Sequence, residues 1–338
     1  MAPSATADET AVASDPAILQ LRKLLTSETT PLAKRFRALF SLKHLASLSP
    51  PTSQTVPAIQ AIAAAFSSPS ALLKHELAYC LGQSRHDAAV PYLRAVLEDA
   101  NEDAMCRHEA AEALGALGDV GSLELLRKLK DQTGLPDVIT ETCAIAVARI
   151  EWEHSKRSQE EQSHLKQSDF ASIDPAPPLP SDDAISHLPI EDLQRTLLDT
   201  KLSLFERYRA MFTLRDLASP PDLPTALPAI EALASGFTDP SALFRHEIAF
   251  VFGQLSHPAS IPALVTTLRN TNEVGMVRHE AAEALGSLGE EEGVDAILRE
   301  FVDDEEQVVR ESCVVALDMA EYERSGQEEY ALMPEVGA

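Results

Sequence analysis

The sequence predicts an all-α fold, an α-α superhelix of eight helical repeats in two duplicated halves of four. Three observations predict it. Apolar residues recur with the 3.6-residue period of amphipathic helices, and strand-like alternation is absent. Long segments of the chain occur twice, and within each half a shorter unit returns after 33 residues. A period in this range is typical of helical solenoids.

The duplication is visible when the two halves are compared directly. Residues 31–47 read PLAKRFRALFSLKHLAS, and residues 203–219 read SLFERYRAMFTLRDLAS. Later in the first half, SALLKHELAYCLGQ is matched in the second half by SALFRHEIAFVFGQ. The two halves are therefore copies of one arrangement of repeats.

Each repeat is predicted to be a pair of helices, because turn-forming residues such as Asp119 and Pro240 fall between the apolar segments or at their start. The pairs expected in the first half are 17–26 with 31–46, 56–66 with 70–82, 88–98 with 104–117, and 121–131 with 137–152. The pairs expected in the second half are 190–200 with 203–218, 227–236 with 241–254, 259–269 with 275–288, and 292–302 with 306–322.

The two helical halves are predicted to span residues 17–153 and 190–322. Between them, residues 154–189 are rich in Ser, Asp and Pro and poor in periodic apolar residues, so we expect a flexible linker. Residues 1–16 are small, polar and acidic, and residues 323–338 also lack a helical pattern. We expect a disordered N-terminus and a poorly ordered tail.

The charge balance excludes some classes of partner. The chain has 53 acidic and 28 basic residues, which gives a formal net charge of −25. This charge would repel nucleic acids and anionic membrane surfaces, and it favours cationic partners. No segment approaches the length of a membrane span, and the first 16 residues lack the features of a signal or transit peptide. We therefore expect a cytoplasmic protein that binds neither nucleic acid nor membranes.

The cysteines lie inside apolar helical segments and form no CxxC pair. This pattern does not predict a disulfide framework or a thiolate zinc site, and it fits a reducing compartment. The cysteines are Cys80, Cys106, Cys143 and Cys313.

A histidine followed by a glutamate recurs at one register of the second helices. The helices share the pattern Arg-x-x-Ala-x-x-x-Leu, and the two variable positions hold His-Glu only in the middle two repeats of each half. Helix packing alone does not demand the pair, because the other repeats lack it. The four pairs are His75-Glu76, His108-Glu109, His246-Glu247 and His279-Glu280. The other repeats hold Phe36-Arg37, Glu141-Thr142, Tyr208-Arg209 and Glu311-Ser312.

The helical period places these histidines away from the apolar stripe. At about 100° per residue, His75 lies roughly 160° from Leu77, which faces the core. A single histidine is usually an ordinary surface or core residue. Here four of ten histidines share one register with a glutamate beside each, so we favour a common function. Neighbouring second helices in a solenoid stack about 8–10 Å apart, which lets their imidazoles converge on one inner surface.

Imidazole and carboxylate groups together suit iron, manganese or zinc. None of the four pairs extends to the HExxH motif of zinc peptidases, because the fourth residue after each histidine is Tyr79, Glu112, Phe250 or Glu283. Two histidines and one glutamate per metal would give the arrangement of oxygen-activating non-haem iron. Because a histidine and the next residue diverge by about 100° around a helix, we expect some glutamates to reach across to the other half.

These motifs resemble those of a known family. KHELAYCLGQ, RHEAAEALGALG, RHEIAFVFGQ and RHEAAEALGSLG are similar to the motifs of deoxyhypusine hydroxylases, which consist of HEAT repeats. The resemblance covers nearly all of residues 17–322, and none of the four pairs departs from it.

The resemblance implies a monooxygenase with a non-haem di-iron centre, Fe2+ in its reduced state, and dioxygen as co-substrate. Its partner would be the deoxyhypusine form of translation factor 5A, which it would convert to hypusine. Deoxyhypusine is a lysine extended by an aminobutyl arm with two positive charges, which suits an acidic chain. We expect the chain to act as a monomer.

Carried onto this chain, the resemblance implies two ligand sets that combine residues of both halves. Glu109 and Glu280 would then serve the substrate as catalytic residues, or bind metal themselves. The two implied sets are His75, His108 and Glu247 for one iron, and His246, His279 and Glu76 for the other.

Other interpretations of the sequence remain open at this point. Most HEAT solenoids are non-catalytic scaffolds that bind proteins on a concave surface, and a dinuclear hydrolase would also need two metals. A bilin-lyase relative would share the repeats but would not explain the His-Glu pairs. Glu112 and Glu283, one turn after two of the histidines, could bond a ligand or belong to a solvated helix face.

Overall fold

The computed structural model describes residues 15–161, 170–180 and 189–325. Throughout these residues the regular structure is helical and no strand occurs, so the predicted all-α fold is confirmed. The count of eight repeats stays a prediction. Residues 1–14 and 326–338, which hold most of the segments predicted to be disordered, lie outside the described residues.

The helices follow the predicted pairs closely. The first helices of the pairs are α2 (Pro16–Thr26), α4 (Thr55–Ala63), α6 (Val90–Glu98), α8 (Leu123–Lys130), α11 (Ile190–Leu198), α13 (Ala226–Ala234), α15 (Ile261–Arg269) and α17 (Val294–Arg299). The second helices are α3 (Leu32–Ala46), α5 (Ala71–Gly82), α7 (Ala104–Ala116), α9 (Asp137–Glu153), α12 (Leu204–Leu217), α14 (Ala242–Leu255), α16 (Gly275–Gly286) and α18 (Gln307–Ser325). A short helix that the sequence did not predict, α10 (Lys156–Glu161), follows α9.

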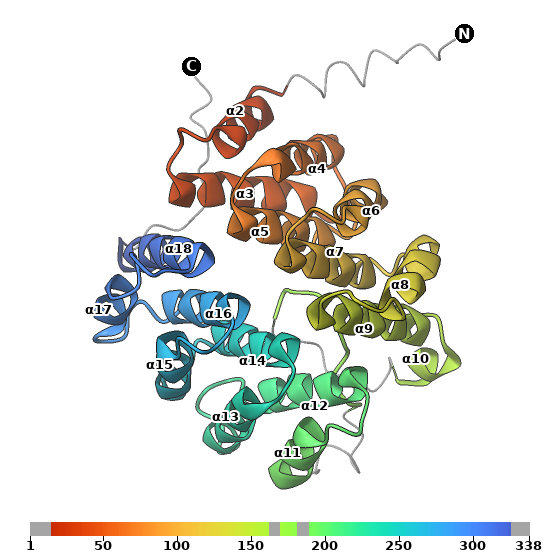
Figure 1. Ribbon diagram of the computed structural model, residues 1–338, viewed down its shortest axis with the longest axis vertical. Coiled ribbons are helices and arrows are strands. Elements are labelled where there is room, and N and C mark those ends of the chain that lie inside the picture. The colour runs from red at the N-terminus through yellow and green to blue at the C-terminus, as the bar shows by residue number, and fades with distance from the viewer. Residues whose placement is uncertain (1–14, 162–169, 181–188, 326–338) are drawn as a thin grey trace. The chain divides into compact units, whose positions relative to one another are not determined.

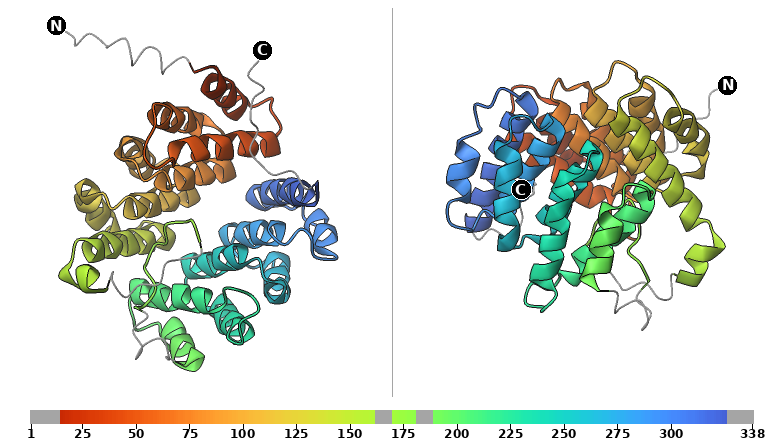
Figure 2. Two further views of the ribbon diagram at one scale, coloured as in Figure 1. Left: turned by 180° about the vertical axis from the view of Figure 1, so that it is seen from behind. Right: turned by 60° about the horizontal axis from the view of Figure 1, so that its bottom comes forward.

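By its contacts the chain divides into two compact units, with the division after Leu117. In the first unit α3, α5 and α7 stack in chain order, and α2, α4 and α6 form a second row (Figure 1). In the second unit α12, α14, α16 and α18 stack in the same way, with α11, α13, α15 and α17 in the second row (Figures 1 and 2). Each unit therefore has two layers of helices, with the apolar stripes buried between them.

The fourth helix pair of the chain belongs to the second unit by its contacts. Helix α9 packs against α12 and α14, and the Ser241 hydroxyl donates to Glu141 of α9 at 2.7 Å. Burial raises the pKa of the Glu141 carboxyl above its usual value. Sequence similarity shows which helices are equivalent copies but not which neighbours they contact. The predicted halves, 17–153 and 190–322, were defined by sequence similarity and not by contacts. Their boundaries stay a prediction.

In α3, α7, α12 and α16 the arginine of the repeat pattern ties the two helices of a pair together. Its Nε donates to a backbone carbonyl ten residues earlier, at the end of the first helix. Carbonyls at a helix C-terminus have no partner within the helix, so this contact satisfies one of them. The contacts are Arg35 to Leu25 (2.8 Å), Arg107 to Leu97 (3.1 Å), Arg207 to Leu197 (2.8 Å) and Arg278 to Leu268 (2.9 Å).

Part of the predicted linker 154–189 packs within the second unit. Its residues 162–169 and 181–188 lie outside the described residues, whereas residues 170–180 lie against the second unit. Ala176 is fully buried, and the backbone N–H of Leu179 donates to the Thr213 hydroxyl at 2.9 Å. A search for periodic apolar residues does not detect a segment that is held by polar contacts, and the flexibility of the linker stays a prediction.

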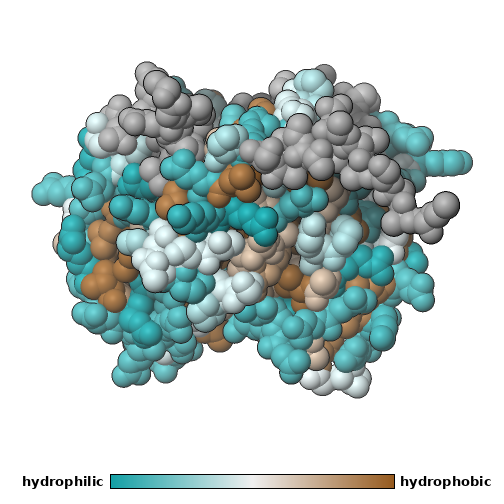
Figure 3. Space-filling view, turned by 90° about the horizontal axis from the view of Figure 1, so that it is seen from above, coloured by the Kyte–Doolittle hydropathy of each residue, from teal (hydrophilic) through white to brown (hydrophobic). Residues whose placement is uncertain are grey.

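The surface carries both hydrophilic and hydrophobic residues (Figure 3). On the face drawn in Figure 3, hydrophilic residues predominate and hydrophobic residues form small separate patches. Within the described ranges, no helix combines the length and apolarity that a membrane crossing requires. The four cysteines are buried and free.

Candidate metal centre

Three of the four helices that carry the His-Glu pairs begin at a capping side chain, whereas α16 begins after Val274 without one. Ser70, Asp103 and Ser241 precede α5, α7 and α14, and each side chain accepts a hydrogen bond from a backbone N–H of the first turn. Such N-caps stabilise the start of a helix. A fixed start sets the rotation of the helix about its own axis. This rotation in turn sets the direction in which the histidine projects.

All eight side chains of the four pairs are buried. The histidines are at most 5% exposed and the glutamates at most 8%. The helical period placed them off the apolar stripe, and they are nevertheless enclosed. Burying an imidazole or a carboxylate is costly unless polar neighbours or a metal compensate it. Each of these buried imidazoles and carboxylates therefore requires a polar neighbour or a metal that compensates for its loss of water.

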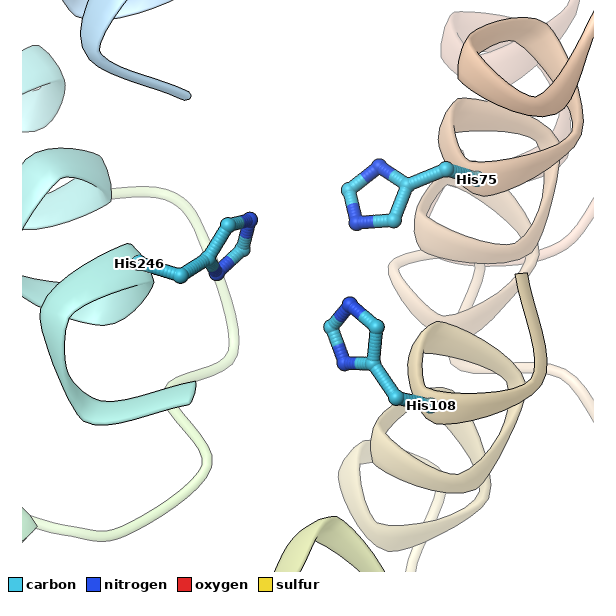
Figure 4. A group of neighbouring side chains, drawn as sticks. All are labelled: His75, His108 and His246. Atoms are coloured by element: carbon cyan, nitrogen blue, oxygen red, sulfur yellow. The ribbon is translucent and has the colours of Figure 1, made fainter. Parts of the chain in front are cut away.

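In the first unit two histidines and a glutamate come together. His75 on α5 and His108 on α7 project from the same side of neighbouring helices (Figure 4), and their ring centroids are 5.3 Å apart. His75 Nε2 lies 3.3 Å from Oε2 of Glu109. His108, Glu109 and Glu112 also offer ligand atoms that lie within 4.8 Å of one another.

The second unit repeats this arrangement. His246 on α14, also labelled in Figure 4, and His279 on α16 have ring centroids 5.4 Å apart. His246 Nε2 lies 3.3 Å from Oε2 of Glu280. His246, His279 and Glu280 offer ligand atoms within 4.8 Å of one another, which is the spacing of a metal site. In both units the glutamate comes from the next helix of the stack.

The glutamates beside the imidazoles are Glu109 and Glu280. For these two, the resemblance implies a role with the substrate, with metal binding as the alternative. Glu76, by contrast, accepts a hydrogen bond from the Cys80 thiol at 3.9 Å. The predicted binding of Glu76 and Glu247 to metals held by histidines of the other half stays a prediction.

Glu112 and Glu283 lie close to the histidines that precede them by one turn. Glu283 Oε1 is 3.5 Å from His279 Nδ1 and accepts a hydrogen bond from the Ser312 hydroxyl at 3.1 Å. Glu112 shares the cluster of His108 and Glu109. In the sequence, the signal for these two glutamates was their spacing of four residues from a histidine. Glutamate is also common on solvated helix faces, so this signal was not specific. These carboxylates can orient the imidazoles from behind, a role usual for groups around metal sites.

The chemistry of these donors fits a borderline divalent metal. Each unit gathers imidazole nitrogens and carboxylate oxygens, the set that suits iron, manganese or zinc. The nearby thiol of Cys80 is a poor donor on chemical grounds, because burial first and Glu76 second raise its pKa well above the usual value. A protonated thiol is a poor metal ligand.

Close approach of the second helices brings the imidazoles together. A Cβ added to Gly82 of α5 would lie 2.7 Å from Cβ and 2.8 Å from Cα of Ala113 on α7. At the equivalent position of the second unit, a Cβ on Gly253 would lie 3.4 Å from Ala284. The first contact is too short for any residue but glycine, whereas the second is ordinary van der Waals contact.

Comparison with known proteins places these features in a family. A family model described as HEAT repeats matches residues 57–147 and 207–318. A deoxyhypusine hydroxylase of Phaeosphaeria nodorum is 69% identical over 324 residues, which are 96% of this chain and 97% of the relative. A deoxyhypusine hydroxylase of Aspergillus fumigatus is 66% identical over 337 residues, 100% of this chain and 99% of the relative.

A solved structure agrees with the described fold. The structure of human deoxyhypusine hydroxylase in complex with glycerol matches with a TM-score of 0.79 and 42% sequence identity. The match covers 93% of this chain and 98% of the human chain.

The two glycines provide a matched test of the helix spacing. Gly82→Ala is expected to lower the free energy of unfolding by about 1–3 kcal/mol, because the added methyl group forces α5 and α7 apart. It should also weaken manganese binding by the first unit. Gly253→Ala is expected to change stability by less than about 1 kcal/mol, since the favourable effect of alanine in a helix offsets a modest contact. Urea denaturation and manganese titration measure both effects, and equal behaviour of the two variants would contradict this account.

Proposed function

This chain belongs to the deoxyhypusine hydroxylase family, and from that premise we propose that it hydroxylates the deoxyhypusine side chain of translation factor 5A to hypusine. The observation that carries the proposal is the occurrence, in each unit, of two buried histidines with a glutamate 3.3 Å from one imidazole. A scaffold for protein binding would gain nothing from burying these ionisable groups, because their desolvation lowers stability.

We propose that each unit binds one iron. The geometry supports His75, His108 and Glu109 as one ligand set. His246, His279 and Glu280 are the equivalent set. Iron held there would supply the redox chemistry that places one oxygen atom of dioxygen into an unactivated C–H bond, which acid–base side chains cannot do. The burial of the ligands keeps bulk water away from the reacting position.

The remaining two carboxylates of the pairs are suited to the substrate. Glu76 and Glu247 are 8% and 2% exposed, and they follow His75 and His246 directly in the chain. The aminobutyl arm of deoxyhypusine is cationic, so buried carboxylates beside the ligand sets would attract it and hold it in one orientation. The net charge of −25 favours the approach of the same substrate.

The proposal also covers partners and location. The acidic chain is expected to bind the cationic side chain of one protein partner, and neither nucleic acid nor anionic membranes. We propose that it acts as a monomer in the cytoplasm, a reducing compartment that suits its four free cysteines.

The proposed activity has a direct test. The chain is loaded anaerobically with ferrous iron and then given a reductant, isotopically labelled dioxygen and factor 5A that carries deoxyhypusine. Mass spectrometry is expected to show one labelled oxygen atom in the modified lysine. Product without the label, or equal product in the absence of dioxygen, would contradict oxygenation by dioxygen.

Substitutions can separate the role of Glu109 and Glu280 from the role of Glu76 and Glu247. Glu109→Ala and Glu280→Ala are each expected to lose about one iron per chain, because removal of a ligand undermines the coordination geometry. Glu76→Ala and Glu247→Ala are expected to keep iron and to bind the deoxyhypusine protein more weakly. Metal analysis and equilibrium binding measure the two effects. The reverse pattern would support the ligand sets that combine both halves.

A further inference from the structure

An ion pair joins the two helices of each ligand set beside the first histidine of the set. In the first unit Lys74, the residue before that histidine on α5, pairs with Glu102 in the loop that leads to α7. In the second unit Arg245, the residue before the histidine on α14, pairs with Glu273 in the loop that leads to α16. Each glutamate follows its basic partner by 28 residues. Both copies of the duplicated arrangement therefore contain the same contact.

These ion pairs are enclosed and have defined geometry. The four side chains are at most 14% exposed. Arg245 donates from Nε and Nη2 to the two carboxylate oxygens of Glu273, at 2.7 and 2.6 Å. Each glutamate also accepts a hydrogen bond from the backbone N–H of the next residue, Asp103 or Val274, at 2.8 Å. An enclosed pair of this kind holds its partners more firmly than an exposed pair, which solvent screens.

Each ion pair acts at the start of the helix that carries the second histidine. Helix α16 has no capping side chain, so the ion pair and the backbone contact of Glu273 are what fix its first turn. In the first unit a second contact joins the helix starts, because the Cys106 thiol of α7 donates to the Ala71 carbonyl of α5 at 3.4 Å. The residue equivalent to Cys106 in the second unit is Val277, which cannot donate. The second unit has the two-pronged arginine contact in its place.

The two ligand sets have nearly the same dimensions although their helices pack differently further along. The ring centroids are 5.3 and 5.4 Å apart, and in both units a glutamate lies 3.3 Å from an imidazole. Seven residues after the first histidine, a Cβ added to Gly82 would lie 2.7 Å from α7, whereas a Cβ added to Gly253 would lie 3.4 Å from α16. Tight packing at the glycine is therefore not shared by the two units, whereas the ion pair beside the first histidine is.

We propose that Glu102 and Glu273 are positioning residues, which hold the second histidine and the glutamate of each ligand set at metal-binding distance from the first histidine. They act through Lys74 and Arg245 and not as ligands. The inference rests on the proposed function, because it assumes that each unit binds one metal. Displacing one ligand helix lowers the affinity, since bonds to a metal tolerate only small changes of distance.

Variants of the basic partners test this role by a metal titration. Manganese(II) alone is added to the metal-free chain, and free manganese is followed by electron paramagnetic resonance. The original chain is expected to bind two ions. Lys74→Met and Arg245→Met are each expected to raise the Kd of one ion roughly tenfold, as is usual when a group that orients a ligand is lost, and to leave the other ion unchanged. Lys74→Arg and Arg245→Lys exchange the residues of the two units, so they should keep both Kd values close to the original ones.

An ion pair between two helices without His-Glu pairs provides the control. Arg127 of α8 pairs with Glu151 of α9, and both side chains are 52% exposed. Arg127→Met is expected to leave both Kd values unchanged.

A double variant separates position from charge. Lys74→Met combined with Glu102→Gln removes both charges and the contact, and it is expected to bind one ion as weakly as Lys74→Met does. Recovery of the original Kd would trace the loss to the uncompensated charge of Glu102, and it would overturn the inference.

Urea denaturation separates positioning from stability. A lower midpoint in Lys74→Met and Arg245→Met, with both Kd values unchanged, would show a role in stability alone and would overturn the inference while leaving the metal sites in place. If the original chain binds no manganese, the proposed metal centre fails and the inference fails with it.

Discussion

The structure depends on the compensation of eight buried ionisable side chains on four helices. Each imidazole or carboxylate that leaves water must regain its interactions from neighbours or from a metal. Within each unit the first part of this compensation is visible, because Glu109 and Glu280 lie beside the imidazoles of the preceding helix. The two helices of each set are packed neighbours, and α5 and α7 approach most closely at Gly82. The fold therefore acts as a frame that sets the distance between ligands.

Duplication supplies two similar ligand sets, but their surroundings differ. In the first unit the Cys80 thiol donates to Glu76, whereas the equivalent residue in the second unit is Val251. Helices α5 and α7 require a glycine at their contact, and α14 and α16 do not. Residues 170–180 are bound to α12 and α14 through Asp174 and Ser172. Two metals held by such sets would share their ligand types but not their neighbouring groups, so the two copies need not behave identically.

Much of the fold and the main residues of the site could be predicted from the sequence. The helix pairs and the shared register of His75, His108, His246 and His279 follow from periodicity and duplication. The choice of Glu109 and Glu280 over Glu76 and Glu247 as neighbours of the imidazoles could not be predicted. It depends on contacts between successive helices, whereas the sequence shows only spacing within one helix. The packing of residues 170–180 escaped prediction for a related reason, since Asp174 and Arg215 are far apart in the chain and carry no periodic signal.

Iron content, measured by mass spectrometry after anaerobic reconstitution with ferrous salt, tests the central claim most directly. The account predicts two irons per chain in the original protein and about one fewer in each folded variant that lacks a ligand histidine. His44→Ala, which changes an exposed histidine outside the sets, should keep both. A folded original chain with only trace iron, or full iron in all of the variants His75→Ala, His108→Ala, His246→Ala and His279→Ala, would contradict the account.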